Sequence, residues 1–281
     1  MGCTGRIVLS RFAVASVMTV LALFVSQLAR AEELVEACSN PPFPGSRTAI
    51  DEQCGVEGSG GEEAAQNAIK NNFCASSPPA AMTFARLREL QSSVEHDAQI
   101  NFGDRANHGS HGPTTDRAPL TALGEGRLVQ LKGFVLAAKQ EGAESVNCGH
   151  EFDDVANKNS FHDIHISMVE TRELASPADP SEEAANECQG IVVEMVPHHR
   201  PKMWTPTSVR KVRDAHVMVR VTGQLFFDSS HVPCADGSGV RSNPKRFSLW
   251  EIHPIYAFEV CTANCDQEGT WVSLEQWLQQ Q

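Results

Sequence analysis

Two histidines and three carboxylates lie in short runs where apolar and polar residues alternate: Asp163, His165, Glu194, Glu251 and His253. Such alternation predicts β-strands, in which successive side chains point to opposite faces. The polar residues of each run then share one face, and apolar neighbours such as Ile164, Val193 and Ile252 share the other. Imidazoles and carboxylates bind zinc and other divalent ions, and they are also common general acids and bases.

The strands that would position these residues form a regular series in the second half of the chain. We expect five strands, over residues 128–138, 161–168, 191–196, 216–227 and 247–260. A helix is expected over residues 205–215, because Thr205 followed by Pro206 is a typical helix start. The order of three strands, a helix and two strands predicts a mainly β protein with some α, a five-stranded Greek-key barrel of the OB type.

The barrel prediction places the polar faces side by side. In an OB barrel the second strand pairs with the third and the third with the fifth, so the five side chains should meet on one surface. We call Asp163, His165, Glu194, Glu251 and His253 the five-residue cluster. Three interpretations are open: a site for a divalent metal or another ligand, a hydrolytic site, and charge-paired hydrogen bonds that stabilise the sheet.

Catalytic motifs are absent from the sequence. It contains no Gly-x-Ser-x-Gly, no His-Glu-x-x-His and no phosphate-binding Gly-x4-Gly-Lys-Ser/Thr. We therefore expect a non-catalytic binding domain for an unknown small molecule, glycan or protein. A metal-dependent hydrolase that uses His165, Glu194 and His253 is the enzyme alternative, a structural partner of the cell envelope is a third, and a divalent metal is the one cofactor indicated.

The N-terminal residues predict export. Arg6 and Arg11 precede an apolar stretch over residues 12–28, and Ala29-Arg30-Ala31 then resembles a cleavage site. We expect residues 1–31 to be a signal peptide, which leaves no membrane anchor after cleavage and places the protein in the periplasm or outside the cell. Cleavage lowers the count of Lys and Arg from 23 to 20 against 35 Asp and Glu, a charge of −15. Such an acidic protein repels phosphate backbones, so nucleic acid is not an expected partner.

Eight cysteines remain after cleavage: Cys38, Cys54, Cys74, Cys148, Cys188, Cys234, Cys261 and Cys265. An even number in an exported chain predicts disulfides, although the sequence does not fix their pairing. From their positions we expect Cys148 and Cys188 to staple the middle of the barrel. One further pair is expected among the three N-terminal cysteines.

The rest of the chain divides by composition. Residues 32–100 predict an irregular, disulfide-tied segment with helices over 62–73 and 82–94, and residues 101–124 predict a linker. The barrel should occupy residues 125–262. Residues 263–281 should hold a C-terminal helix, because apolar residues recur at helical spacing over 271–278.

Three runs of the barrel region carry a resemblance. Residues 247–255 read Phe-Ser-Leu-Trp-Glu-Ile-His-Pro-Ile, and residues 221–228 and 161–166 precede them with similar strands. Together they resemble a group of poorly characterised bacterial exported proteins that have a Trp-Glu-Ile-His-Pro strand, over roughly residues 125–262. The segment around Cys54 and Cys74 is also similar to that group. The resemblance implies an OB-like barrel and a bacterial source, and it implies no activity.

Calcium-dependent nucleases of the staphylococcal type share the barrel and make a phosphodiesterase the specific form of the enzyme alternative. They use paired acids beside arginines near the second and third strands. This chain has histidines there, with Arg200 as a lone arginine, and its acidic charge also counts against that activity.

Overall fold

The computed structural model describes residues 50, 54–75, 78–97, 99–100, 102, 117–149, 161–234, 245–265 and 267–281. The predicted signal peptide and Cys38 lie outside these residues. Within the described ranges, no helix is both long and apolar enough to cross a membrane.

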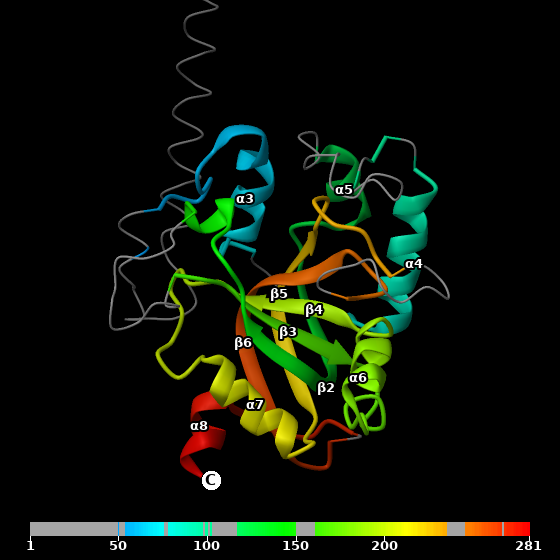
Figure 1. Ribbon diagram of the computed structural model, residues 1–281, viewed down its shortest axis with the longest axis vertical. Coiled ribbons are helices and arrows are strands. Elements are labelled where there is room, and N and C mark those ends of the chain that lie inside the picture. Colours follow the sequence, from blue (N-terminus) through cyan, green and yellow to red (C-terminus); the bar gives the residue numbers. More distant parts are fainter. Residues whose placement is uncertain are drawn as a thin grey trace, which may run out of the picture. The chain divides into compact units, whose positions relative to one another are not determined.

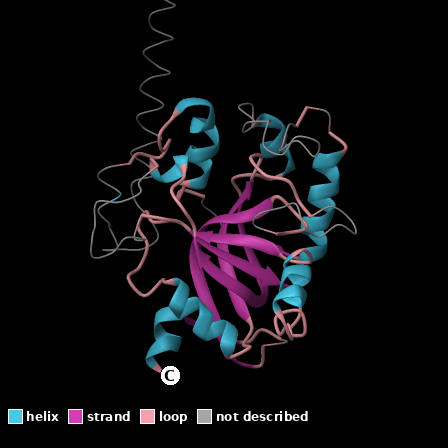
Figure 2. Ribbon diagram, viewed as in Figure 1, coloured by secondary structure: helices cyan, strands magenta, loops and turns pink. Residues whose placement is uncertain are grey.

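Five strands close into a barrel (Figures 1 and 2): β2 Leu128–Gln140, β3 Ile164–Val169, β4 Ile191–Met195, β5 Val219–Phe227 and β6 Trp250–Ala263. Going round the barrel, β2 pairs with β3, β3 with β4, β4 with β6, β6 with β5, and β5 again with β2. The β4–β6 pair is parallel and the other four are antiparallel. This closed order is that of the OB fold, so the predicted fold class is confirmed.

The helix expected between the third and fourth strands is α7, Pro206–Asp214. It begins with Pro at its first position, and the Thr205 side chain accepts a hydrogen bond from the backbone N–H of Ser208. The first backbone N–H groups of a helix have no partner within the helix. Thr205 accepts a hydrogen bond from one of them, and Pro206 has no N–H group that would need a partner. Val209 and Val212 are its fully buried residues, and the helix packs mainly against β2.

Alternation along the strands fills the barrel with apolar side chains. Ile164, Ile166, Val193 and Ile252 are all at most 1% exposed and belong to one continuous core. The intervening residues of β3, β4 and β6 therefore point to the outer face of the sheet. That outer face carries the polar residues singled out by the sequence.

Close packing between β5 and β6 explains one glycine of the barrel. A Cβ atom on Gly223 would lie 2.4 Å from the carbonyl oxygen of Pro254, a separation that real Cβ atoms do not show. The pairing of β5 with β6 also shifts register on either side of Gly223. Glycine is therefore needed here for a close backbone approach at an irregular point of the sheet.

The segment before the barrel is partly helical, as predicted. The short 3-10 helix η1, Gly61–Glu63, leads into α3, Ala64–Lys70, and a second helix, α4, covers Phe84–Glu95. The apolar stripe of α4 includes Phe84, Leu87 and Leu90, which join the core of the barrel. Between them, β1, Ala80–Met82, pairs with β2 in parallel.

Several elements differ from the sequence prediction. The helix expected over residues 271–278 is wrong in its first turn, because β7, Thr270–Ser273, pairs with β6 and α8 covers only Leu274–Gln279. The helix α6, Pro180–Glu187, was not expected; its start is marked by Asp179, whose carboxylate accepts two backbone hydrogen bonds. A further helix, α5, Ala118–Leu123, lies in the expected linker, whose residues 103–116 are outside the described part of the chain.

Three disulfides connect described residues: Cys54–Cys148, Cys188–Cys234 and Cys261–Cys265. Such bonds are typical of an oxidising compartment. The expectation that Cys148 and Cys188 staple the barrel together is wrong, since each bonds a distant cysteine instead. Cys74 is also disulfide-bonded. The pair expected among Cys38, Cys54 and Cys74 stays a prediction, because Cys38 lies outside the described residues.

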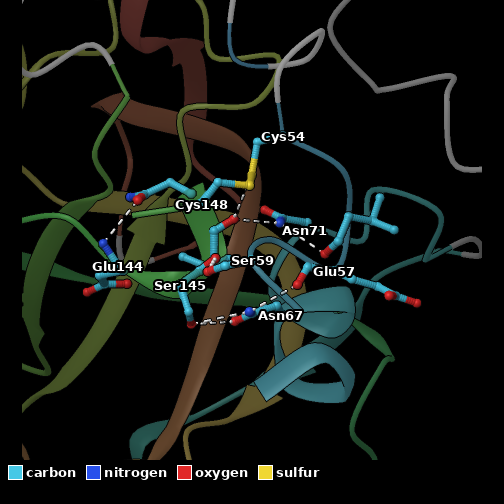
Figure 3. The surroundings of a disulfide bond; sticks show 11 residues. Cys54, Glu57, Ser59, Asn67, Asn71, Glu144, Ser145 and Cys148 are labelled. Carbon is cyan, nitrogen blue, oxygen red and sulfur yellow. Dashed lines mark hydrogen bonds between the residues drawn. A yellow bond between two sulfur atoms is a disulfide. The ribbon is translucent and has the colours of Figure 1, made fainter. Parts of the chain in front are cut away.

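The Cys54–Cys148 bond ties the N-terminal segment to the loop that follows β2 (Figure 3). Beside it, the amide of Asn71 donates to the carbonyl oxygen of Val146, and that of Asn67 donates to the Ser145 hydroxyl. Residues Ser145–Asn147 form the 3-10 helix η2, which lies directly against α3. Sheet, loop and N-terminal segment are thus joined at one place.

Candidate functional site

Strand register brings the five-residue cluster together. His165 of β3 lies directly opposite Glu194 of β4, and Val193 of β4 is level with Ile252 of β6. Glu194 and His253 follow these two residues and share the outer face. All five members are buried: Asp163, Glu251 and His253 at 0% exposure, Glu194 at 2% and His165 at 5%.

His165 bridges two carboxylates. Its Nε2 lies 2.6 Å from Oε1 of Glu194, and its Nδ1 lies 2.9 Å from Oε1 of Glu141, at the end of β2. Burial alone would lower the pKa of His165, but the Glu194 carboxylate and the contact with Glu141 outweigh it and raise the pKa to about 10. The same contact with His165 lowers the pKa of Glu141 to about 2 despite its partial burial. His165 therefore holds both carboxylates in place.

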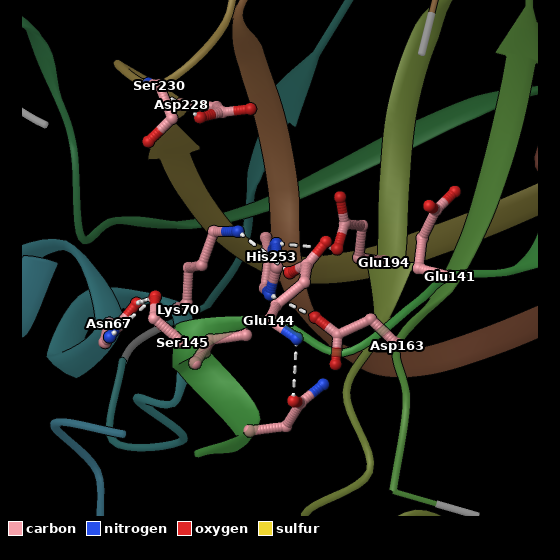
Figure 4. A network of polar contacts seen from close by, with 12 residues as sticks. Asn67, Lys70, Glu141, Glu144, Ser145, Asp163, Glu194, Asp228, Ser230 and His253 are labelled. Atoms are coloured by element: carbon pink, nitrogen blue, oxygen red, sulfur yellow. Dashed lines mark hydrogen bonds and ion pairs between the residues drawn. The ribbon is translucent and has the colours of Figure 1, made fainter. Parts of the chain in front are cut away.

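His253 lies at the centre of the cluster and contacts three acids, two of which, Asp163 and Glu194, are seen beside it in Figure 4. Its Nδ1 is 3.2 Å from Oε2 of Glu194 and 3.4 Å from Oε2 of Glu251, and its Nε2 is 3.6 Å from Oδ2 of Asp163. Burial opposes the charge of His253, but the field of Glu194 outweighs it and raises the pKa of His253. In turn, His165 and His253 keep the pKa of Glu194 well below its usual range despite its burial.

Asp163 is the member with the fewest partners. Its carboxylate is fully buried, and within the described part of the chain neither oxygen has a hydrogen-bond donor. Burial first, and repulsion by Glu144 second, raise the pKa of this carboxyl to about 8. Leaving a buried acceptor without a donor costs about 1–3 kcal/mol, so the position needs an explanation beyond the stability of the sheet.

Lys70, the last residue of α3, brings a buried positive charge to the edge of the cluster (Figure 4). Its Nζ lies 3.6 Å from Oε2 of Glu144, and its pKa is raised well above the usual value because Glu144 and Glu194 outweigh the effect of burial. The N-terminal segment therefore covers the outer face with a charge that complements it.

A second ion-pair network supports the cluster from β5 and β6. Arg246 is fully buried and bonds to both Glu251 and Asp228, with its Nη2 2.6 Å from Oδ2 of Asp228. His231 contacts the same oxygen of Asp228 at 2.5 Å. Arg246 thus neutralises Glu251 through Oε1, and Oε2 of Glu251 faces His253.

Comparisons with protein-family models, curated proteins and solved structures found no match for this chain. The arrangement of the side chains is therefore the basis for any statement about function. Ligand atoms of two groups of three residues lie within 4.8 Å of one another: Asp163, Glu194 and His253, and beside them Glu141, Glu144 and His165. We call these the inner group and the outer group. Both have the ligand types of a divalent metal site.

The structure brings together all five residues predicted from the sequence, and it adds several that the sequence did not indicate. Glu141 and Glu144 lie in the loop after β2, where no periodic pattern marks them. Lys70 comes from a helix far away in the chain. Asp228 and Arg246, in contrast, flank the paired strands β5 and β6, so their proximity could have been predicted from the OB order.

From the lowered pKa of Asp228 we expect that part of the unfolding free energy is lost in acid. Burial opposes ionisation, but His231 and Arg246 together hold the pKa of this carboxylate well below its usual range. The folded state thus binds its proton less readily than the unfolded state, and the stabilisation present above about pH 4 should be lost as the pH falls further. We expect the difference in unfolding free energy between the wild type and Asp228→Asn to shrink between pH 5 and pH 3, measured by urea denaturation. A difference that stays constant over this range would contradict the assignment.

Proposed function

We propose that this protein is an exported, non-catalytic OB-like domain that binds a small, positively charged ligand at the inner group. The observation that supports this most is Asp163, a fully buried carboxylate whose two oxygens have no hydrogen-bond donor among the described residues. A network that served the sheet alone would pair this group or replace it with an apolar residue. A bound cation would contact these oxygens directly, whereas Nε2 of His253 is 3.6 Å from the nearer of them.

The size and charge of the site limit the ligand. Inner-group residues are at most 2% exposed, so the ligand that fits is an ion or a very small molecule rather than a glycan chain or a protein surface. Acidic groups outnumber fixed positive charges around it. Glu144, Glu194 and Glu251 all act on Lys70, and this surplus of negative charge favours a cation over an anion.

Export is the second part of the proposal. The arrangement of Arg6, Arg11 and the apolar stretch over residues 12–28 supports a signal peptide, and the three disulfides agree with an oxidising destination. The resemblance to bacterial exported proteins supports the same compartment. Signal-peptide cleavage after Ala31, detected by mass spectrometry of the protein recovered from the producing cell, is the expected result.

Thermal denaturation in the presence of different ligands tests the binding function. We expect at least one cation among Zn²⁺, Ca²⁺, Mg²⁺ and spermidine to raise the melting temperature by several degrees, because a ligand at about 100 times its Kd adds about 2.7 kcal/mol. The shift should disappear in Asp163→Asn. It should persist in Asp214→Asn, because Asp214 forms an exposed ion pair with Arg213 away from the cluster. A shift that only neutral sugars produce, equally in both variants, would refute the proposal.

A hydrolytic function is the second candidate, with one observation in its favour. The pKa of Asp163, raised to about 8 by burial, lies near the value that suits proton transfer at neutral pH. A substrate would have to reach a carboxyl that is fully buried. Turnover of a p-nitrophenyl ester or phosphodiester that Asp163→Asn abolishes would favour this candidate over the binding function.

A further inference from the structure

We propose that the inner group, Asp163, Glu194 and His253, is a site for one divalent transition-metal ion of the zinc class. This inference rests on the proposed function, because it names the cation that the site would bind. Two carboxylates and one imidazole are a ligand set that zinc accepts, with a fourth position left for water or another ligand. The nitrogen ligand favours such an ion over calcium or magnesium, which prefer oxygen.

The first argument is the set of atoms without partners. Among the buried side-chain atoms that have no hydrogen bond within the described residues are both oxygens of Asp163, Oε2 of Glu194 and Nε2 of His253. These are one or more atoms from each member of the inner group, and all three side chains are at most 2% exposed. These atoms face one another only through the ion-pair contacts of His253, at 3.2 Å and 3.6 Å, and three neighbouring residues with buried atoms that lack a hydrogen bond indicate a missing common partner.

The second argument is the distances between these residues. A ligand atom of each member lies within 4.8 Å of one from each of the other two, and Nε2 of His253 is 3.6 Å from Oδ2 of Asp163. Ligand atoms bound to zinc at about 2.0–2.2 Å lie about 3–4 Å apart in tetrahedral geometry. Side-chain rotations that move the ligand atoms by about 1 Å are therefore enough to close the group around an ion.

The third argument is that two of the three ligands, His253 and Glu194, are already oriented by a neighbour. Glu251 lies 3.4 Å from Nδ1 of His253, on the opposite side of the ring from Asp163, and Glu251 is itself bonded by Arg246. His165 binds Oε1 of Glu194 at 2.6 Å and leaves Oε2 on the side of His253. Metal-binding histidines and carboxylates typically have such supporting partners, which fix the ring and the carboxylate.

The charges of the surroundings support a dication. Among the residues that the structure describes, six buried or half-buried acids belong to the site or its supporting network: Glu141, Glu144, Asp163, Glu194, Asp228 and Glu251. The permanently charged cations in contact with them or acting on them are Lys70, Arg200 and Arg246. Protonated His165 adds one further positive charge, so that six carboxylates face four positive charges when His253 is neutral and bound to a metal, and one divalent ion balances the difference.

Titration calorimetry with ZnCl₂ on protein freed of metal by a chelator tests the inference. We expect one Zn²⁺ per chain in the wild type, with binding weakened at least about 100-fold in Asp163→Asn and His253→Gln, which remove a ligand. His165→Gln, which removes the support of Glu194 but no ligand of the inner group, should weaken binding about 10-fold. Asp214→Asn should bind as the wild type does.

A second measurement does not depend on the folding of the variants. Co²⁺ added to the wild-type protein should give the intense visible absorption of a four-coordinate site, and Zn²⁺ should displace it. Glu144→Gln separates the two groups, because it removes a ligand of the outer group and no ligand of the inner group. Zinc binding that is lost in Glu144→Gln but unchanged in Asp163→Asn would place the ion in the outer group and overturn the inference.

The failure of this inference differs from the failure of the proposed function. If the folded wild type shows neither heat with Zn²⁺ nor absorption with Co²⁺ at concentrations up to about 1 mM, the metal site does not exist. If spermidine or another cation still stabilises the protein in a way that depends on Asp163, the binding function is retained with a different ligand. If no cation does so, both proposals fail together.

Discussion

Asp163→Asn is expected to stabilise the ligand-free protein by about 1–3 kcal/mol at neutral pH, although the same change removes ligand binding. The wild-type carboxylate is fully buried, has no donor among the described residues and is repelled by Glu144 and Glu194. With its pKa raised to about 8, this carboxyl must take up a proton on folding at neutral pH, whereas an amide of the same shape is neutral in both states and offers two N–H donors to the neighbouring acids. Urea denaturation of both proteins, freed of metal, measures the difference.

The control for this prediction is Asp214→Asn, an exposed substitution that should change stability by no more than about 0.5 kcal/mol. A stability gain at Asp163 combined with lost binding is typical of a residue kept for function at a cost to the fold. If the Asp163→Asn variant is instead less stable than the wild type by more than about 1 kcal/mol, the carboxylate belongs to the network that stabilises the sheet.

Arg246→Met should lower the unfolding free energy by about 3–5 kcal/mol, the largest loss expected for any single substitution discussed. Arg246 is fully buried and bonds to both Asp228 and Glu251, so its removal leaves two buried carboxylates without their cation. Methionine fills a similar volume, which limits the contribution of a cavity to the loss. Chemical denaturation followed by circular dichroism is the measurement.

Arg213→Met is the matched control, because Arg213 pairs with Asp214 at the surface and such pairs contribute about 0–1 kcal/mol. A further variant replaces the whole buried network, with Arg246→Met, Asp228→Leu and Glu251→Met together. It should recover part of the lost stability, since apolar residues can substitute for a buried ion network when no charge is left behind. Equal losses in Arg246→Met and Arg213→Met would show that the buried network is not important for stability.

Much of the barrel could be predicted because its signals are local. The alternation of Ile164, Ile166 and Met168, and the Thr205–Pro206 start of α7, identify strands and helix without reference to the rest of the chain. The C-terminal residues show the limit of this reasoning. Val272 fits a helical pattern, but it pairs with Val260 because β6 extends beyond the closed part of the barrel and offers a free edge.

The cluster could be predicted because strand order converts sequence patterns into neighbours. His165 and Glu194 meet through a register that follows directly once their strands are taken as adjacent. Contacts from irregular segments could not be predicted in this way. Lys70 and Glu144 approach the cluster through a helix and a loop whose positions depend on tertiary packing. The predicted pairing of Cys148 was wrong for the same reason: its partner, Cys54, lies 94 residues away in an irregular segment whose position depends on tertiary packing.

The covering of the cluster by α3 has a consequence for kinetics. Asn71 and Lys70 fasten this helix to the loop after β2, and the Cys54–Cys148 bond prevents the two segments from separating far. Anything bound beneath the helix can exchange with water only when this local region opens, which happens far more often than unfolding of the whole barrel. Release should therefore be slow and its rate set by helix opening, so that reduction of the disulfide would speed exchange even where affinity changes little.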